Sequence, residues 1–199
     1  SDCLYTDNKT FESTLAYFCS PVLMASKVSN LVSISKQEIP SVIGLVQSYN
    51  KDFAKYDINI LPVCECGNRV LLFVYRQSLL GEYLREENVS SMLEEYGYHK
   101  HKSLNYYVSI LSMRMKKGNF PHEIGLFLGY PVEDVRGFVE KQGRDYKYNG
   151  YWKVYGDCNL AIRRFNTYDK LRNYMLGKLS GGESLDSILS QNKNKLFTA

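Results

Sequence analysis

The sequence lacks an apolar run of the roughly 18–20 residues that a membrane-spanning helix needs. Its N-terminal residues also lack the basic and then apolar pattern of a secretory signal peptide. Five cysteines stand at irregular spacing, which fits free thiols in a reducing compartment better than a disulfide framework. We therefore expect a cytoplasmic protein without a membrane span.

Clusters of metal ligands are missing as well. Cys64 and Cys66 offer two thiolates, but a structural zinc ion takes four ligands, and no further Cys or His pair supplies the rest. Two of the three histidines, His99 and His101, lie among lysines, which disfavour a bound cation. We predict no metal site, while the identity of any cofactor stays open.

What the sequence does contain fits one ordinary domain. Its 199 residues are 44% hydrophobic and 23% charged, and 17 of them are tyrosines. The formal net charge of +4 is uneven, because residues 98–178 hold 15 Lys and Arg against 7 Asp and Glu. Such a basic stretch marks an anionic partner or only solvated helix faces, and we favour the second interpretation. We expect a single domain over residues 1–199, with loose termini at 1–8 and 191–199.

Helical periodicity covers much of the chain. Apolar residues recur at helical spacing over 9–19, and this helix should end before Pro21, because proline disfavours a helical residue before it. From Gln77 onward the chain is mostly helical, with Ser103 and Asp157 as helix caps. The helices therefore outnumber the strands in the predicted fold.

Strands are predicted in the first half of the chain. Residues 58–63 and 70–75 are the arms of a predicted hairpin that turns at Gly67 and Asn68. The second arm is almost wholly apolar, which is typical of a central strand covered on both faces. We predict an α/β (α+β) fold, in which a small mixed sheet of three or four strands is covered by many helices.

The densest pattern is FPHEIGLFLGYPVEDVRGFVEK, residues 120–141. Its apolar and small residues have the spacing of a helix-turn-helix, at Ile124, Gly125, Leu128, Gly129 and Val135. The second helix would carry Glu133 and Asp134 at the end where a recognition helix meets phosphates, and carboxylates there repel DNA. We therefore predict a helix-turn-helix-like corner without DNA binding, in which Leu126 and Phe127 are buried.

His122 and Glu123 form a pair at the start of this corner. They do not make the zinc-protease motif H-E-x-x-H, because no second histidine follows at the i+4 position. Glu123 is favourable in a first helical turn for electrostatic reasons alone. His122 can serve as a general acid or base, since an unperturbed imidazole titrates near neutrality.

A second aromatic pattern, GYWKVYG, follows the corner. In a strand, Trp152 and Val154 would share one face, and Lys153 and Tyr155 the other. One face is then core, and the other is a polar or ligand-facing wall. Aromatic residues beside Lys and Arg also bind single-stranded nucleic acid, an interpretation that we disfavour.

Three segments, LLFVYR, HEIGLFLGYPVEDVRGF and YKYNGYWKVYGD, together resemble the bacterial family known as domain of unknown function 3793. The resemblance covers nearly the whole chain. Family members usually open with a segment like C-A-P-T-L-A-G-x-K, of which CSPVLMASK keeps Cys19, Pro21, Leu23 and Lys27 but not the glycine. The resemblance implies signature segments rather than an activity. As a lead for partners, it suggests iron uptake and flavodoxin function in anaerobic bacteria.

Polar residues of these segments define the leading hypothesis, a binding or accessory protein for a small anionic ligand. The candidate ligand-binding residues are Lys27, Arg76, Tyr130, Lys153 and Tyr155. The candidate catalytic residues are His122, Cys19 and Glu123. The three cations among them would favour a phosphate or a carboxylate. The alternatives are an enzyme that uses His122 as acid or base with Cys19, and the DNA-binding regulator that Glu133 and Asp134 disfavour. The oligomeric state and any protein partners stay open.

Overall fold

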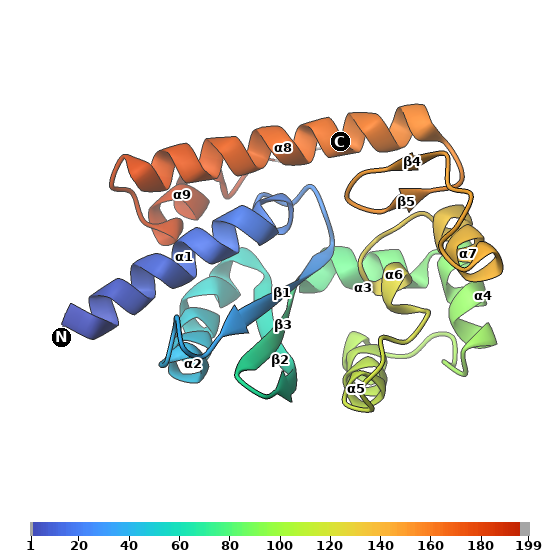
Figure 1. The fold of residues 1–199 in the computed structure, drawn as a ribbon, viewed down its shortest axis with the longest axis horizontal. Helices are drawn as coiled ribbons and strands as arrows, with labels where there is room; N and C mark the ends of the chain where they lie inside the picture. The colour runs from blue at the N-terminus through green and yellow to red at the C-terminus, as the bar shows by residue number, and fades with distance from the viewer. Residues whose placement is uncertain (1, 196–199) are drawn as a thin grey trace.

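A computed structural model describes residues 2–195 of the chain. At its centre lies an antiparallel sheet with the strand order β1-β3-β2, covered by helices (Figure 1). The strands are β1 (Ser29–Ser35), β2 (Ile58–Cys66) and β3 (Arg69–Arg76), and a separate short hairpin is formed by β4 (Tyr148–Asn149) and β5 (Lys153–Val154). The predicted α/β class, with a small sheet under many helices, is confirmed, but the three-stranded sheet is wholly antiparallel rather than mixed.

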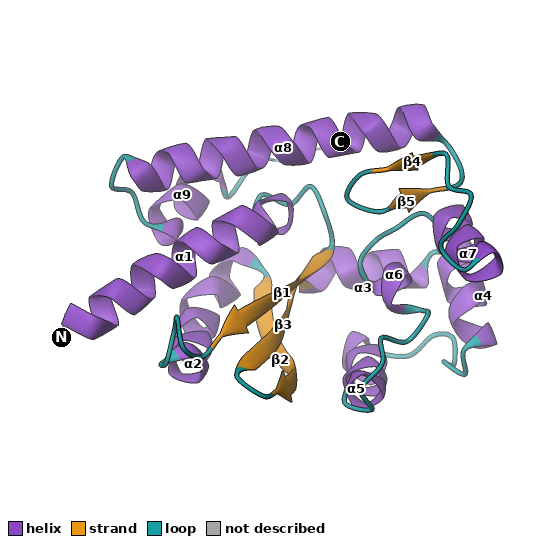
Figure 2. Ribbon diagram, in the orientation of Figure 1, coloured by secondary structure: helices purple, strands orange, loops and turns teal. Residues whose placement is uncertain are grey.

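Helices account for most of the described chain (Figure 2). Their bounds are α1 (Asp2–Leu23), α2 (Val42–Phe53), η1 (Ala54–Tyr56), α3 (Gln77–Arg85), α4 (Glu87–Glu95), α5 (Leu104–Met115), α6 (Ile124–Phe127), α7 (Val132–Lys141), α8 (Cys158–Ser180) and α9 (Leu185–Asn192). The predicted caps are confirmed, because the side chains of Ser103 and Asp157 accept hydrogen bonds from the first turns of α5 and α8.

The central strand β3 is covered on both faces, as its apolar sequence predicts. Val70, Leu72 and Val74 pack in the core with residues of α1 and α2. Phe73 and Tyr75 point to the other face and pack with residues of α3, α4 and α5. The alternation follows from the two-residue repeat of a strand. Gly67 makes the predicted turn with a φ of 56°.

Helix α1 differs from the prediction at both ends. It begins at Asp2, where a loose lead-in over 1–8 was expected, and it continues through Pro21 to Leu23 instead of ending at Cys19. Proline lacks the N–H that would pair with the carbonyl one turn earlier. Arg172 of α8 supplies a substitute, because its Nε donates to the Tyr17 carbonyl at 2.7 Å.

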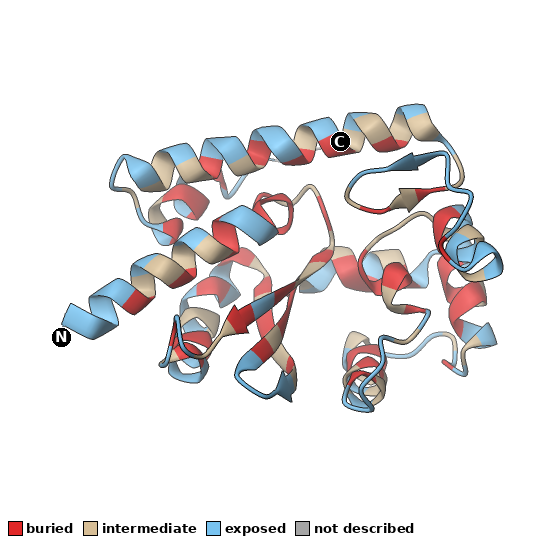
Figure 3. Cartoon of the chain, in the orientation of Figure 1, coloured by how far each residue is buried: buried red, intermediate tan, exposed pale blue. Residues whose placement is uncertain are grey.

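Helix α8 runs along most of the length of the molecule and links α9 and α1 at one end to the β4–β5 hairpin at the other (Figure 1). Its C-terminal half packs beside α1, and its N-terminal half lies over the β4–β5 hairpin. Trp152 and Val154 of the hairpin are buried, as predicted, against Phe165 and Tyr168 of α8. The inward faces of these elements are buried, and the outer face of α8 is exposed (Figure 3). At the C-terminus, the predicted loose segment 191–199 is helical at 191–192, and 196–199 lie outside the described residues.

Candidate functional site

The corner at residues 120–141 comprises α6, a four-residue connection and α7. Leu126 and Phe127 are buried, as predicted. Gly129 in the connection has a φ of 76° and lies so close to Val28 that a Cβ would come within 2.8 Å of that side chain. The glycine is thus required both by its conformation and by close packing. Because α6 is a single turn, a helix-turn-helix is not established.

Asp134 ties the corner to the hairpin. Its carboxylate is buried and accepts three hydrogen bonds, from the Trp152 indole at 2.8 Å and from the backbone N–H groups of Tyr155 and Gly156 at 2.9 and 2.8 Å. A buried carboxylate is tolerated when several donors surround it. The sequence suggested Asp134 only as a charge that repels DNA, so its structural role was missed.

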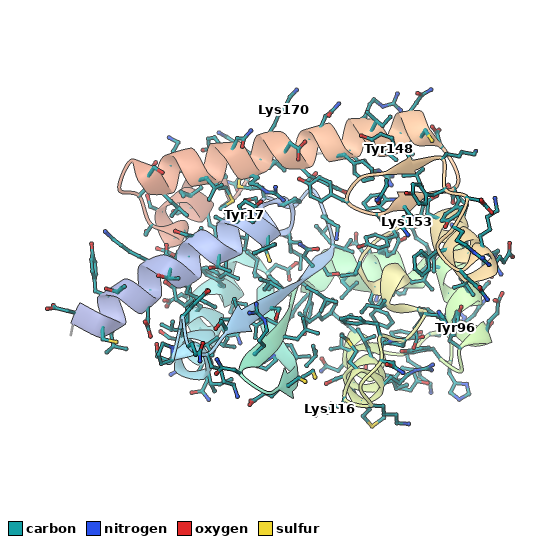
Figure 4. The ribbon with its side chains drawn as sticks, in the orientation of Figure 1. Tyr17, Tyr96, Lys116, Tyr148, Lys153 and Lys170 are labelled. Atoms are coloured by element: carbon teal, nitrogen blue, oxygen red, sulfur yellow. The ribbon has the colours of Figure 1, made fainter. Side chains whose placement is uncertain are left out.

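A cavity of about 420 Å³ opens between α6, α7 and the hairpin. Most of its wall is apolar and aromatic, and Leu31 of β1 closes one side. Three of the eight predicted residues line it, namely His122, Tyr130 and Lys153. Figure 4 labels Lys153 on the hairpin. This convergence brings together segments that are 31 residues apart in the sequence, from His122 to Lys153.

The polar groups of this cavity differ in how exposed they are and in how many hydrogen bonds they already make. The Lys153 ammonium donates to the Gly143 carbonyl at 2.8 Å, which occupies one of its three N–H groups. The His122 side chain is exposed at the cavity. Tyr130 stacks on Trp152 with ring centroids 4.8 Å apart, and burial raises the pKa of its hydroxyl to about 12. The cavity therefore offers an aromatic wall, one fixed cation and one accessible imidazole.

Lys27 lies next to this cavity but does not line it. Its Nζ donates to the Ser29 carbonyl at 2.6 Å and to Asn30 Oδ1 at 3.2 Å, and sits 5.3 Å from the centroid of the Tyr130 ring. Burial lowers the pKa of Lys27 to about 7, and the neighbouring Cys19 opposes this shift. A lysine in this state can change its charge near neutral pH.

Arg76, Glu123 and Tyr155 lie elsewhere and make structural contacts. Arg76 donates to the carbonyls of Val22, Leu23 and Tyr56, all within 2.8 Å, and so caps the end of α1. Its pKa is lowered by burial. The eight predicted residues thus do not converge on one cavity.

Glu123 is fully buried and pairs with Arg114 at 2.8 Å and with the Tyr98 hydroxyl at 2.9 Å. Its neighbour in the sequence, His122, is exposed instead. Tyr155 donates its hydroxyl to the Arg144 carbonyl at 2.9 Å. These contacts hold α5, α6 and the hairpin in place rather than face a ligand.

Cys19 is buried in the apolar core between α1 and the sheet. Burial raises the pKa of its thiol to about 12, so the nucleophilic thiolate is scarce at neutral pH. His122 is exposed in a different part of the molecule. The pairing of Cys19 with His122 that the enzyme alternative requires is therefore not present.

The chain matches the family described as Protein of unknown function (DUF3793) over residues 15–189. The chain belongs to this family. No curated protein and no solved structure matches it. Within residues 2–195, no three His, Cys, Asp or Glu side chains are placed to hold a metal ion, and none of the described helices is long and apolar enough to cross a membrane.

The DUF3793 signature segments can now be given physical reasons. Gly125 and Gly137 allow close packing, since a Cβ would come within 2.9 Å of Val135 and 2.4 Å of Tyr155, respectively. The segment around Asp134 and Trp152 is fixed by their hydrogen bond. The sequence holds one signal for this hydrogen bond. A buried indole N–H usually finds an acceptor, so a buried Trp152 predicts a nearby acceptor such as Asp134.

Proposed function

We propose that this DUF3793 protein binds a small anionic ligand with a flat apolar body, in the cavity between α6, α7 and the hairpin. The observation that supports it is the meeting of His122, Tyr130 and Lys153 on one largely apolar wall. The cavity volume of about 420 Å³ lies within the range of known small-molecule sites. The Lys153 ammonium keeps two N–H groups that can meet an anionic substituent.

The aromatic wall favours a planar ligand. Tyr130 and the largely buried Trp152 are already stacked on each other, so the parts of their rings that line the cavity are rigid at low conformational cost. Asp134 also borders the cavity, but its carboxylate accepts three hydrogen bonds. These donors offset its negative charge, so its repulsion of a bound anion is reduced. An aromatic carboxylate, sulfonate or phosphate ester fits this combination.

The test uses 1-anilinonaphthalene-8-sulfonate, an aromatic anion whose fluorescence rises in apolar sites. We expect the folded protein to bind it at one site. Lys153→Gln should weaken binding by about tenfold, which corresponds to one charge-assisted hydrogen bond. Lys170→Gln is the matched control, because Lys170 is exposed and extends from α8 away from the rest of the molecule (Figure 4).

A second variant tests the place of binding. Leu31→Phe adds volume on the β1 side of the cavity and should abolish binding while the protein stays folded. Equal binding by the original protein, Lys153→Gln and Leu31→Phe would show that the probe lies elsewhere and would refute the proposal. Flavin mononucleotide, an aromatic phosphate ester, belongs in the same titration, because the family resemblance suggests a link to iron or flavodoxin metabolism.

The DNA-binding alternative gains no support from α7. Arg136, the cation in its first two turns, pairs with Glu95 at 3.1 Å, and Asp134 is buried against the hairpin. The N-terminal end of α7 therefore carries little free positive charge for a phosphate backbone.

A further inference from the structure

A second cavity of about 490 Å³ lies between the α1–β1 connection, α3 and α8. It shares no lining residue with the first cavity, although the two adjoin at Tyr130. Its lining combines cations, carboxylates and tyrosine rings, including Lys27, Tyr83, Glu86, Glu133, Arg164 and Tyr168. This composition differs from the apolar wall of the first cavity and calls for another class of ligand.

One side of this cavity offers hydrogen-bond donors. Lys27 is buried, and in its protonated form two of its three N–H groups are taken by Ser29 and Asn30, so one is left. The Ser26 hydroxyl is buried and has no hydrogen-bond partner. A buried polar atom without a partner is unusual in a folded protein, and this hydroxyl would meet a ligand in the cavity once the Ser26 side chain rotates. Arg164 lies in the same lining and forms no salt bridge with any residue of 2–195.

Carboxylates occupy the rim of the same cavity. Glu86 and Glu133 are both exposed there, and neither forms a salt bridge with another residue in the described part of the chain. Burial raises the pKa of the Tyr83 hydroxyl; Glu86 and Glu133 add to this shift, and Arg164 opposes it. Positively and negatively charged side chains therefore lie close to the Tyr83 hydroxyl without forming a salt bridge with each other.

We propose that this second cavity binds a free α-amino acid. The carboxylate would lie against Lys27 and Arg164, with the Ser26 hydroxyl turned toward it, and the ammonium would face Glu86 and Glu133. A simple anion would be repelled by the two carboxylates, and a simple cation by Arg164. A zwitterion places each charge beside its opposite, while Tyr83 and Tyr168 provide flat walls for its side chain.

The experiment is isothermal titration calorimetry of the whole chain with each of the twenty standard amino acids. Acetate and methylamine, which each carry one of the two charges, are titrated in parallel. We expect at least one amino acid to bind with a Kd near or below about 1 mM, and both single-charge analogues to bind at least about tenfold more weakly. No binding of any amino acid up to about 10 mM overturns the proposal, as does acetate binding as tightly as the best amino acid.

Variants locate the site. Arg164→Met and Glu133→Gln should each weaken the best amino acid by about tenfold or more. The matched control is Arg163→Met, because Arg163 is the next residue of α8 and is exposed outside this cavity. Equal loss or equal retention of binding in Arg163→Met and Arg164→Met overturns the proposal.

Failure here can be told apart from failure of the first site. Leu31→Phe blocks only the first cavity, so it should leave amino-acid binding unchanged. If Leu31→Phe abolishes amino-acid binding and Arg164→Met does not, the amino acid occupies the first cavity and the second-cavity proposal is overturned. Circular dichroism melting of each variant confirms that it is folded before it is titrated.

Discussion

The two cavities adjoin at Tyr130 but use their charged residues differently. Around the first cavity, Asp134 accepts three hydrogen bonds, so its charge helps to hold the fold, whereas Lys153 uses only one of its three N–H groups on a backbone carbonyl. Around the second, Arg164, Glu86 and Glu133 form no salt bridge with any residue of 2–195. The first should therefore select a ligand mainly by shape and apolar contact, with Lys153 as its one anion-binding group, and the second mainly by charge.

This difference has a thermodynamic consequence. A charge that is saturated by protein donors contributes to stability, so removing it should unfold structure before it alters binding. A charge without a protein partner contributes little to stability, so removing it should alter binding and leave the fold intact. Substitutions can therefore show, for each cavity, whether its charged residues stabilise the fold or bind a ligand.

The largest expected effect is that of Asp134→Ala. It removes the acceptor of three donors, the Trp152 indole and two backbone N–H groups, and leaves them buried without a partner. We expect the free energy of unfolding to fall by about 3–5 kcal/mol, measured by chemical denaturation. Glu140→Ala, on the exposed side of the same helix, should change it by less than about 0.5 kcal/mol. A loss below about 1 kcal/mol in Asp134→Ala would contradict a structural role.

Lys27 should give a smaller effect that depends on pH. Its pKa is lowered from 10.5 to about 7, so between these values the unfolded chain holds a proton that the folded chain has lost. The free energy of unfolding should then rise with pH above about 7, by up to about 1.4 kcal/mol per unit. In Lys27→Met this rise should disappear, whereas it should persist in Lys51→Met, in which an exposed lysine is replaced.

The pH range of that experiment has an upper limit. The Cys19 thiol has its pKa raised from 9.0 to about 12, so the folded state binds the extra proton above pH 9 and stability should fall there. Denaturation is therefore measured between about pH 6 and 8.5, where the Lys27 contribution dominates. Identical pH profiles for the original protein and Lys27→Met in this range would show that Lys27 keeps an ordinary pKa.

Local sequence patterns predict much of the fold. The apolar run of β3, the turn at Gly67 and the caps Ser103 and Asp157 each depend on neighbouring residues, and the structure confirms them. The predicted end of α1 was wrong. Pro21 cannot donate a backbone hydrogen bond to the Tyr17 carbonyl, and Arg172, 151 residues away in the sequence, donates to that carbonyl instead. Such long-range compensation leaves no trace in the local pattern.

The candidate site was harder to predict for the same reason. His122, Tyr130 and Lys153 lie in distinctive segments, so they could be selected, and the structure brings them to one cavity. Arg76 was selected by its charge, but three backbone carbonyls engage it. Arg164 was missed, because one arginine on a long charged helix looks like an exposed residue until α8 is placed beside the α1–β1 connection.

The smallest expected effect compares two tyrosines of the second cavity. The Tyr83 hydroxyl donates to the Tyr130 carbonyl at 2.6 Å and so fixes the residue at which the two cavities meet. Tyr83→Phe removes this bond and leaves the Tyr130 carbonyl without that donor, so the free energy of unfolding should fall by about 1 kcal/mol. Tyr168→Phe is the matched control: its hydroxyl meets no such carbonyl among residues 2–195, and we expect a change below about 0.5 kcal/mol. Equal losses in the two variants would mean that Tyr83 does not hold Tyr130 in place, and that the boundary between the cavities is set by the stacking of Tyr130 on Trp152 alone.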